Sequence, residues 1–312
     1  VAGVSFDVAA GSALGLVGES GCGKSLTALA LLALAPPHAR IEGSVRFRGR
    51  DLLALPESEL LHVRGAEIAL VFQEPAAALN PVYTVGDQVG EVLRIHRGAD
   101  RRAARRAAIG LLERVGIPDA KHRVDAWPHE LSGGMKQRVC IAMALACKPA
   151  LLIADEPTTA LDVTIQAQIL DLLADLRRSD GLAVLLISHD LGVVGELCDR
   201  VAVMYAGRIV ERGPTNLMLE RPCHPYTRGL LRSRPRLGAP RAADGRLPTI
   251  PGQVPDPRER PSGCAFHPRC ALVQADCRAA VPPLLALAAG HHVACPHHEQ
   301  GEASVASAPI AR

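Results

Sequence analysis

The most constraining feature of this sequence is GESGCGKS at residues 18–25, which matches the pattern G-x-x-x-x-G-K-[ST]. An apolar run, SALGLVG (12–18), precedes the motif and is consistent with a buried strand. A run rich in Ala and Leu, SLTALALLALA (25–35), follows it and stops at Pro36 and Pro37. A strand, a glycine-rich loop and a helix in this order form a phosphate-binding P-loop. The sequence therefore predicts an α/β fold that binds a nucleotide.

The residue types in this loop explain how it would hold phosphate. Glycines allow backbone N–H groups to close around phosphate oxygens, and the N-terminus of the following helix adds a positive dipole. Lys24 is expected to reach the β- and γ-phosphates, and Ser25 to hold Mg²⁺. We interpret Cys22 as a small filler and not as a nucleophile. The predicted nucleotide-binding residues of the loop are Gly18, Ser20, Gly21, Cys22, Gly23, Lys24 and Ser25.

A second motif supplies acidic groups suited to hydrolysis. In ALLIADEPTTALD (150–162), the apolar run LLIA ends at Asp155 and Glu156. A carboxylate at the C-terminal end of a buried strand can hold Mg²⁺ through water, which is the role expected for Asp155. Glu156 is expected to orient or deprotonate the attacking water. The alternative, an acidic surface pair after a core strand, is weakened by the Pro-Thr-Thr-Ala-Leu-Asp sequence that follows.

The segment HELSGGMKQRVCIAMALA (129–146) predicts a second anion site. Ser132 stands at an N-cap position before Gly133 and Gly134, and an amphipathic helix is expected after them. A hydroxyl and bare glycine amides at a helix N-terminus favour an anion. The sequence gives no reason for both phosphate-binding helix starts to face one phosphate within one monomer. Two chains arranged head to tail would satisfy both, with Ser132 of one chain at the γ-phosphate held by Lys24 of the other.

Five segments together resemble the motif set of ATP-binding-cassette (ABC) proteins, in the order typical of that family. They are GESGCGKS (18–25), VFQEP (71–75), LSGGMKQRV (131–139), LLIADEPTTALD (151–162) and LLISHDLGVV (185–194). The resemblance covers roughly residues 1–213 and implies that Gln73 senses Mg²⁺ and the attacking water. It further implies that Ser132, Gly133 and Gly134 belong to the signature motif. Asp155 would be the Walker B carboxylate and Glu156 the catalytic carboxylate. Asp162 would be the D-loop aspartate that makes a contact across the dimer, and His189 would contact the γ-phosphate.

The interval between the P-loop and the signature indicates a transport protein. DNA-repair members of the family carry long coiled coils there, whereas residues 25–131 hold no run of several heptads. Translation-factor members carry two cassettes in one chain, and this chain has one. The sequence after Gln73 predicts a helical subdomain over about residues 75–140, which in such importers docks on short cytoplasmic helices of the membrane subunits. Within it, ALNPVYTVGDQ (78–88) resembles peptide-permease ATPases.

The C-terminal third resembles the ATPases of oligopeptide, dipeptide and nickel importers. RPCHPYTRGLLRSRPRL (221–237) is similar to their His-Pro-Tyr extension, and LPTIPGQVPDPRERPSGCAFHPRC (247–270) is similar to their tail. One departure concerns the aromatic residue that stacks on adenine, which the family carries upstream of the VSF segment. The sequence begins at Val1, so we expect that an N-terminal strand is missing from it. The predicted domains are a cassette (1–213), the extension and a Pro-rich linker (214–260), a four-cysteine region (261–300) and a flexible tail (301–312).

Four of the nine cysteines, Cys264, Cys270, Cys277 and Cys295, crowd into the tail with the spacing C-x5-C-x6-C-x17-C. Disulfides are disfavoured in a reducing cytosol. Structural zinc usually shows C-x2–4-C pairs, and none occurs here, although neighbouring histidines could add ligands. A [4Fe–4S] cluster needs four thiolates and tolerates varied spacing. The importer resemblance also implies such a cluster, while zinc and unliganded thiols remain as alternatives. The neighbouring histidines are His267, His291, His292, His297 and His298.

The bulk properties exclude several other classes. The formal net charge of +3 is too small to argue for a nucleic-acid partner. No apolar stretch reaches the ~18 residues of a membrane span, and no secretory signal opens the chain. We therefore expect a cytosolic protein.

These features together predict an α/β P-loop domain of the ABC type, with an inserted helical subdomain and a C-terminal extension carrying a cysteine-ligated cluster. The predicted function is that of an ATPase using ATP and Mg²⁺, the motor subunit of an importer for dipeptides or oligopeptides. The resemblance implies a second cassette subunit, commonly a paralogue, two membrane permease subunits and, indirectly, an extracytoplasmic binding protein. It implies a peripheral location on the cytoplasmic face of the membrane. A soluble non-transport ABC ATPase is the alternative, whereas a catalytically silent cassette is disfavoured by the intact motifs.

Overall fold

The computed structural model describes residues 1–234, 248–287 and 290–299. It divides into two compact units, each of which is described by itself. The first unit contains Val1–Asp7, Ala13–Thr27 and Ser188–Arg312, and the second contains Val8–Ser12 and Ala28–Ile187. Among the described residues we find no helix that combines the length and the apolar character of a membrane span.

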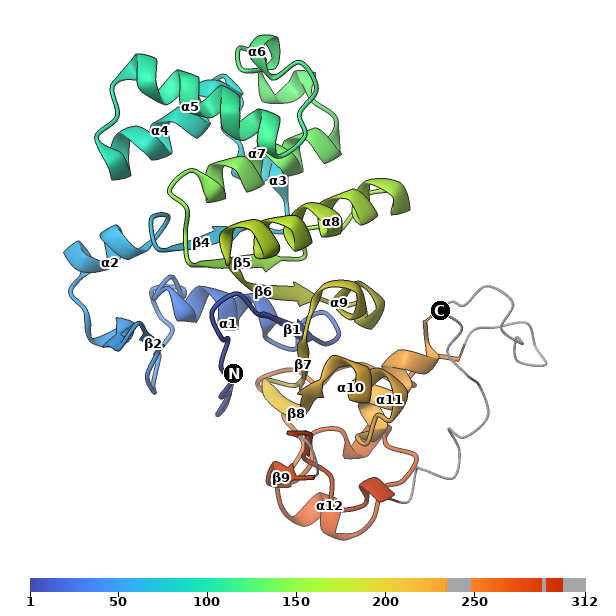
Figure 1. Cartoon of the computed structure of the whole chain (residues 1–312). Helices are drawn as coiled ribbons and strands as arrows, with labels where there is room; N and C mark the ends of the chain where they lie inside the picture. The colour runs from blue at the N-terminus through green and yellow to red at the C-terminus, as the bar shows by residue number, and fades with distance from the viewer. Residues whose placement is uncertain (235–247, 288–289, 300–312) are drawn as a thin grey trace. The chain divides into compact units, whose positions relative to one another are not determined.

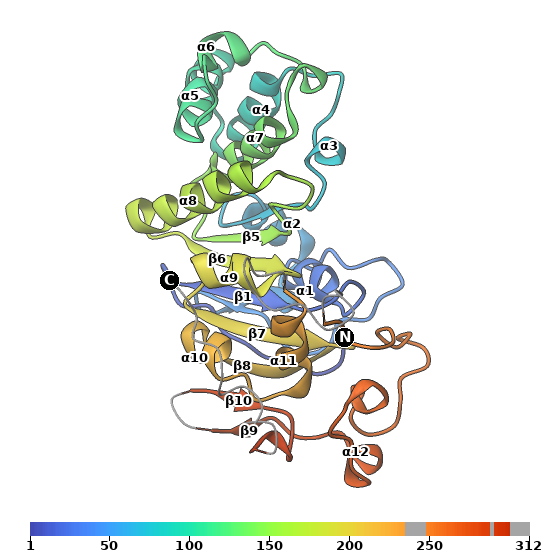
Figure 2. The same ribbon diagram turned by 90° about the vertical axis from the view of Figure 1, so that its right-hand side faces the viewer.

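Five strands lie side by side in the first unit, in the order β1, β7, β8, β10, β9 (Figure 2). Strands β1 and β7 are parallel, and the other neighbours are antiparallel. Every residue of β1 is buried, as the apolar run before the P-loop predicts. The bounds are β1 (Ala13–Val17), β7 (Arg200–Tyr205), β8 (Arg208–Pro214), β9 (Leu285–Ala286) and β10 (His292–Val293), and the helices beside them are α9 (Leu191–Leu197) and α10 (Thr215–Glu220).

The His-Pro-Tyr sequence of the extension forms the start of helix α11 (Pro225–Arg232). His224 is the N-cap, and its Nδ1 accepts a hydrogen bond from the backbone N–H of Tyr226 at 3.1 Å. Burial lowers the pKa of His224 to about 4, so the imidazole is neutral and can accept at Nδ1. Pro225 fills the first helical position, where a missing N–H costs nothing. The motif is therefore a capped helix start, and it buries the Tyr226 side chain completely.

The C-terminal segment joins the sheet of the first unit, which the sequence does not predict. Val293 of β10 lies opposite Glu211 of β8. Short helices η3 (His267–Arg269) and α12 (Asp276–Ala279) lie in the cysteine-rich part. Residues 248–262 contain no helix or strand. The rest of the predicted linker from residue 235 to 247, and the predicted tail, lie outside the described residues.

Three parallel strands form the sheet of the second unit, in the order β4, β5, β6. Their register places Val71 opposite Ala154 and Asp155 opposite Ile187, so the three strands end at the same edge. Nearly all their residues are buried, which confirms the strand predicted before the acidic pair. The bounds are β4 (Ile68–Val71), β5 (Leu151–Asp155) and β6 (Ala183–Ser188).

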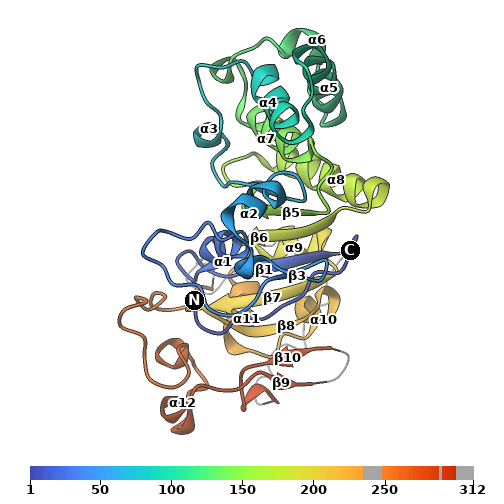
Figure 3. The same cartoon turned by 90° about the vertical axis from the view of Figure 1, so that its left-hand side faces the viewer.

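Helices fill most of the remaining second unit, and α4, α5, α6 and α7 lie together (Figures 1 and 3). The basic segment RGADRRAARR (97–106) runs from the end of α4 into α5, where four of its arginines are exposed while Ala104, Ala108 and Leu112 are buried. The arginines of α5 therefore form a solvated helix face. The bounds are α2 (Glu57–Val63), α3 (Pro75–Ala78), α4 (Val85–Arg97), α5 (Arg101–Arg114), α6 (Ala120–Arg123), α7 (Gly133–Leu145) and α8 (Val163–Asp180), with the short pieces β2 (Arg46–Phe47), β3 (Arg50–Asp51), η1 (Leu52–Ala54) and η2 (Pro128–Glu130).

Helix α7 is not amphipathic, so this part of the prediction is wrong. Its buried residues point to several sides and include Gln137 and Val139 as well as Ile141 and Leu145. The helix packs against α3, α4 and α5 and also against β4. A helix with neighbours on most sides has no broad solvent face and needs no polar stripe.

The contact between α4 and Val124 leads to a stability prediction. A Cβ on Gly86 would lie 2.2 Å from Val124 Cγ2 and 2.5 Å from the Val124 carbonyl oxygen. We expect G86A to lower the free energy of unfolding by about 1–3 kcal/mol, measured by denaturant titration. The matched control is G110A, because a Cβ on this α5 glycine would meet nothing within 4 Å. G110A should raise the free energy of unfolding by about 0.5–1 kcal/mol. Equal effects of both variants would contradict the close packing of Gly86 against Val124.

Candidate active site

The P-loop folds as predicted, between strand β1 and helix α1 (Lys24–Leu31). Gly21 and Gly23 have positive φ angles of 79° and 106°, which glycine adopts at little cost. A Cβ on Gly18 would lie 2.2 Å from the carbonyl oxygen of Met204. The loop therefore needs glycines both for its turns and for its close approach to β7.

The side chains of Lys24 and Cys22 are both buried against the loop. Lys24 Nζ donates to the carbonyl oxygens of Gly18 (2.8 Å) and Glu19 (3.2 Å), so the side chain folds back over the loop. Cys22 is buried, and burial raises the pKa of its thiol. A protonated, inaccessible thiol is a poor nucleophile, in agreement with its interpretation as a filler.

In the second unit, the ends of β4 and β5 bring together Gln73 and Glu156. Gln73 Nε2 donates to Glu156 Oε2 at 3.1 Å. Thr159 Oγ1 donates to the same carboxylate oxygen at 2.8 Å. The sequence did not single out Thr159, and its position three residues after Glu156 is the only signal that was present. Two donors from different segments therefore fix the orientation of the Glu156 carboxylate.

The backbone at Glu156 also departs from regular structure. Strand β5 ends at the buried Asp155, and Glu156 then adopts a φ of 47° in the left-handed region. The Glu156 N–H donates to the carbonyl oxygen of Ile187 at 2.9 Å. A non-glycine residue in this region is strained by about 1–3 kcal/mol, and such strain concentrates at functional sites.

Ser132 and Asp162 are both helix N-caps, and both are exposed. Ser132 Oγ accepts a hydrogen bond from Met135 N–H at 3.3 Å at the start of α7, which confirms its predicted N-cap position. Asp162 accepts from Ile165 N–H at 2.9 Å at the start of α8. Next to Asp162, the Val163 side chain is 82% exposed. The two predicted dimer-contacting residues thus lie on exposed surface of the second unit.

His189 lies in the first unit, directly after the last residue of β6. Its side chain is exposed, whereas Ser188 before it is buried. Asp190 after it caps helix α9, because its carboxylate accepts from Gly192 N–H at 2.6 Å. A buried strand and a capped helix therefore hold the backbone on both sides of His189.

Cys264, Cys270, Cys277 and Cys295 line one pocket in the first unit. All are free thiols, and burial, followed by the charges of the other three thiols, raises the pKa of Cys295 to about 11. Among these four described cysteines, no three sulfurs lie within 4.8 Å of one another. The structure thus gathers the four predicted ligands around one pocket.

The nearby histidines mostly bond to other groups. His267 and His298 face backbone carbonyl oxygens of Cys264 and Cys295, and His291 Nε2 lies 2.7 Å from Glu211 Oε1. His291 forms a close group with Glu211 and Cys223, and Cys223 does not line the pocket. By contrast, the ring nitrogen of His297, a carboxylate oxygen of Asp276 and the pocket's Cys277 Sγ lie within 4.8 Å of one another. His297 is therefore the histidine best placed to share a metal ion with a cysteine of the pocket.

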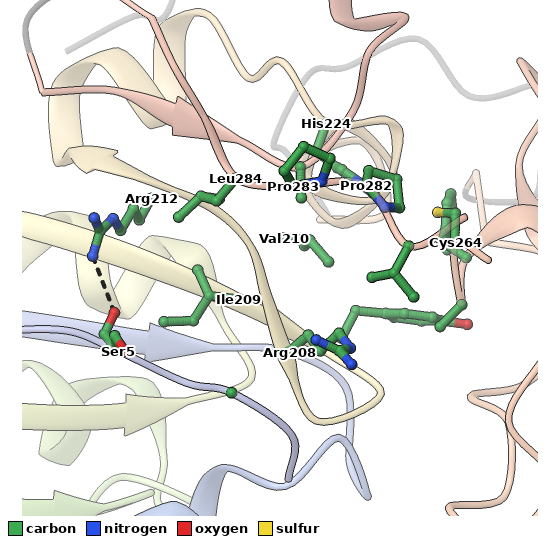
Figure 4. Close-up of a pocket in the computed structure, with 16 residues that line it drawn as sticks. Ser5, Arg208, Ile209, Val210, Arg212, His224, Cys264, Pro282, Pro283 and Leu284 are labelled. Atoms are coloured by element: carbon green, nitrogen blue, oxygen red, sulfur yellow. Dashed lines mark hydrogen bonds between the residues drawn. The ribbon is translucent and has the colours of Figure 1, made fainter. Parts of the chain in front are cut away.

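A larger cavity of about 520 Å³ lies beside the extension, also within the first unit (Figure 4). Arg212 lies at one end, where its guanidinium donates to the carbonyl oxygen of Ser5 at 3.0 Å, and Cys264 lies at the other. Pro282 and Pro283 line the space between them. None of the residues predicted to bind nucleotide is among its lining residues, so this cavity is not the nucleotide site.

Two family models match the chain. Residues 1–159 match the model described as "ABC transporter", and residues 210–277 match the one described as "Oligopeptide/dipeptide transporter, C-terminal region". The "Putative peptide import ATP-binding protein BMEII0863" of Brucella melitensis biotype 1 is 54% identical over 302 residues, which cover 94% of this chain and 89% of that protein. A second protein of the same organism and the same description, BMEII0206, is 53% identical over 294 residues, with coverage of 94% and 87%.

Solved structures agree with this comparison. The ATP-binding cassette MJ0796, determined as a dimer in a post-hydrolysis state with ADP and Pi, aligns with a TM-score of 0.61 and 30% identity. The alignment covers 68% of this chain and 89% of that one. CbiO1 from Clostridium perfringens, part of the transporter complex cbiONQ, aligns with a TM-score of 0.59 and 28% identity, covering 69% and 81%.

Proposed function

The chain belongs to the ABC transporter family of ATP-binding cassettes, and we propose that it is the ATP-hydrolysing subunit of an importer for dipeptides or oligopeptides. The relatives named as peptide import proteins and the matching C-terminal region support the peptide class. The structural observation that carries the proposed activity is the Glu156 carboxylate, held by Gln73 at 3.1 Å and Thr159 at 2.8 Å at the end of β5.

In the proposed reaction, the water polarised by Glu156 attacks the γ-phosphorus of ATP. The bond from this phosphorus to the β,γ-bridging oxygen breaks, ADP leaves, and Glu156 accepts the proton of the water. A general base must be oriented before it can accept a proton along the attack direction, and the two hydrogen bonds to Oε2 provide that orientation. Lys24 and the loop amides bind the phosphates and neutralise charge that develops on them. His189 would contact the γ-phosphate, and the surrounding strand and helix hold its backbone in place.

The side chains assigned to Mg²⁺ are Ser25, Gln73 and Asp155, and they offer the oxygen donors that this ion prefers. Gln73 must present its NH₂ group to the Glu156 carboxylate, so its amide oxygen is the atom turned away from Glu156. Bound there, Mg²⁺ would neutralise phosphate charge. The buried Asp155 would hold Mg²⁺ through a water molecule, as the resemblance to a Walker B carboxylate implies.

A second cassette is the proposed partner at the catalytic site. Ser132 and Asp162 are exposed helix caps, and Val163 beside them is a large apolar side chain left 82% exposed. A partner chain would cover this surface. Ser132 would then contact the γ-phosphate that is bound by the P-loop of the partner chain. The remaining members of the proposed interface, Gly133 and Gly134, contribute helix N-terminal amides to the same phosphate.

The proposed docking surface for the membrane permease subunits lies around the Gln73 loop and α4 in the second unit. Phe72, Val82 and Tyr83 are large apolar side chains that are 50–66% exposed there. Thr84 caps α4 directly after them by accepting from Asp87 N–H at 3.2 Å, which fixes the end of the segment. Phe72 directly precedes Gln73 in the sequence, so movement of a permease helix bound at Phe72 would reach the residue that holds Glu156.

We also propose that the four-cysteine pocket holds a [4Fe–4S] cluster. Around a tetrahedral zinc ion with Zn–S bonds of about 2.3 Å, sulfurs lie roughly 3.8 Å apart. No three of the four described sulfurs lie within 4.8 Å of one another, which fits a cluster better than one zinc ion held by three of them. Cys264, Cys270, Cys277 and Cys295 would be the ligands of the cluster, and a bound cluster would staple the extension. Zinc at Cys277 and His297 is the alternative that the geometry supports next best.

Co-purification tests the transport assignment. Affinity purification of the full chain from detergent-solubilised native membranes should recover two permease subunits and a second cassette, which would place the chain on the cytoplasmic face of the membrane. An extracytoplasmic peptide-binding protein should join the complex when peptide is supplied. Recovery of the chain with nucleic acid or ribosomes, and without permeases, would support the soluble ABC ATPase instead.

A further inference from the structure

The P-loop residue Glu19 is held from the C-terminal extension. Arg269 forms two parallel hydrogen bonds to its carboxylate, with Nη1 to Oε2 at 2.7 Å and Nη2 to Oε1 at 3.0 Å. The Arg269 side chain is only 4% exposed. A bidentate guanidinium–carboxylate pair has a fixed geometry, and leaving the buried guanidinium without its carboxylate is costly. These two residues are 250 positions apart in the sequence, and both belong to the first unit.

The Glu19 backbone is fixed as well. Its N–H donates to the hydroxyl of Tyr226, on helix α11, at 2.8 Å. Its carbonyl oxygen accepts from Lys24 Nζ, the predicted phosphate-binding group, at 3.2 Å. A shift of Glu19 would therefore change the position of the lysine on which phosphate binding depends.

Arg269 is itself placed by the four-cysteine region. It immediately precedes Cys270 and ends the short helix η3, which lies between Cys264 and Cys270. Its Nε donates to the carbonyl oxygen of Pro251 at 2.8 Å. Its guanidinium also lies 5.9 Å from the ring centre of Phe266, two residues after Cys264. Any group that binds both cysteines would hold η3, and with it Arg269, in this position.

Aromatic packing also connects the cysteine region to helix α11. Phe266 packs edge-on against Tyr205, with ring centres 5.2 Å apart, and Tyr205 packs against Tyr226 at 4.7 Å. Tyr205 and Tyr226 are almost completely buried. The cysteine region and the P-loop are thus joined by the Arg269–Glu19 pair and by aromatic packing that ends at Tyr226, whose hydroxyl accepts from Glu19 N–H.

From these contacts we infer that Arg269 is a positioning residue for the P-loop, through which the four-cysteine pocket sets the affinity of the cassette for nucleotide. The inference rests on the proposed function, since it assumes that the P-loop binds ATP. It goes further because it assigns the extension a role in nucleotide binding and not only in stabilising the tail. Loss of the group bound by the cysteines would release η3 and weaken nucleotide binding.

The test measures nucleotide affinity in the full chain by titration with a fluorescent methylanthraniloyl-ATP and Mg²⁺. R269M removes the charge but keeps a long apolar side chain, and we expect its dissociation constant to rise about fivefold or more. E19Q should raise the dissociation constant similarly. The double variant R269M/E19Q should bind nucleotide no less tightly than whichever single variant binds it less tightly. R269K should recover part of the affinity, because an ammonium keeps the charge but not the bidentate geometry.

The matched control is R228M. Arg228 is also a buried arginine of the extension, but it donates to the carbonyl oxygens of Pro222 and His298. R228M should leave the affinity within about twofold of wild type, whatever its effect on stability. In a C270S background, R269M should raise the dissociation constant for nucleotide by a further factor of less than about two. If R269M itself fails to fold, E19Q tests the inference in its place, because Glu19, which pairs with Arg269, is partly exposed.

Two results would overturn the inference: an R269M affinity within twofold of wild type, or an equal loss in R228M. Failure of the proposed function looks different, because wild-type protein would then not bind the nucleotide at all. Wild-type binding together with an unchanged R269M affinity rejects only the role of Arg269.

Discussion

Replacing Glu156 with Gln should reduce ATP turnover by the assembled transporter about 10²- to 10⁴-fold, the range that a general base contributes. The substitution keeps the shape of the side chain, and the amide oxygen can still accept from Gln73 and Thr159, which donate to the carboxylate in the wild type. Only the negative charge that polarises water is lost. ATP binding should therefore persist, and the variant should accumulate as an ATP-bound dimer, detectable by size-exclusion chromatography with bound-nucleotide analysis.

The matched control for this prediction is E67Q. Glu67 precedes β4, the strand that carries Gln73 at its other end, and it pairs with Arg50 at 2.7 Å. E67Q removes a carboxylate from the same unit without touching the Glu156 site, so turnover should stay near the wild-type rate. Normal turnover in E156Q, or an equal loss in E67Q, would remove Glu156 from its assigned role.

The second large effect is expected at the cysteine pocket. Wild-type protein purified without oxygen should contain about four iron atoms and four sulfides per chain and show the broad visible absorbance of an iron–sulfur cluster. C270S should lose this absorbance and most of the iron, because one iron atom loses its thiolate. The unfolding temperature should also fall, since the cluster fixes a segment with little apolar core of its own.

C147S is the control for the cysteine prediction. Cys147 is also a free thiol, but it follows helix α7 in the second unit, is more deeply buried than Cys270 and does not line the pocket. It should retain the full iron content. Colourless wild-type protein with stoichiometric zinc would refute the cluster, and loss of that zinc in H297A would assign the metal to the Cys277 and His297 group.

Local motifs account for most of what the sequence predicts correctly. The P-loop, the acidic pair after β5 and the N-cap at Ser132 each depend on a few consecutive residues, and each lies where its motif predicts. The approach of Gln73 to Glu156 is also understandable, because both follow neighbouring parallel strands that end at one edge. The catalytic and metal-binding roles of these residues remain predictions.

Long-range packing accounts for what the sequence does not predict. The pair of Glu19 and Arg269 leaves no periodic or local trace, since its members are 250 residues apart. Strands β9 and β10 have two residues each, too few to show an alternating pattern. The amphipathic prediction for α7 fails because helices and a strand surround it, and the number of neighbours cannot be read from one segment.

The central claim is that each ATP is held by two chains, with the P-loop of one and Ser132 of the other. The most direct measurement is the ATPase rate per chain as the purified protein is diluted through its monomer–dimer range, for wild type, S132R and the exposed-serine control S58R. The account predicts that the wild-type and S58R rates fall as the dimer dissociates and that S132R is inactive at every concentration. A constant rate per chain in strictly monomeric protein, with S132R as active as wild type, would contradict it.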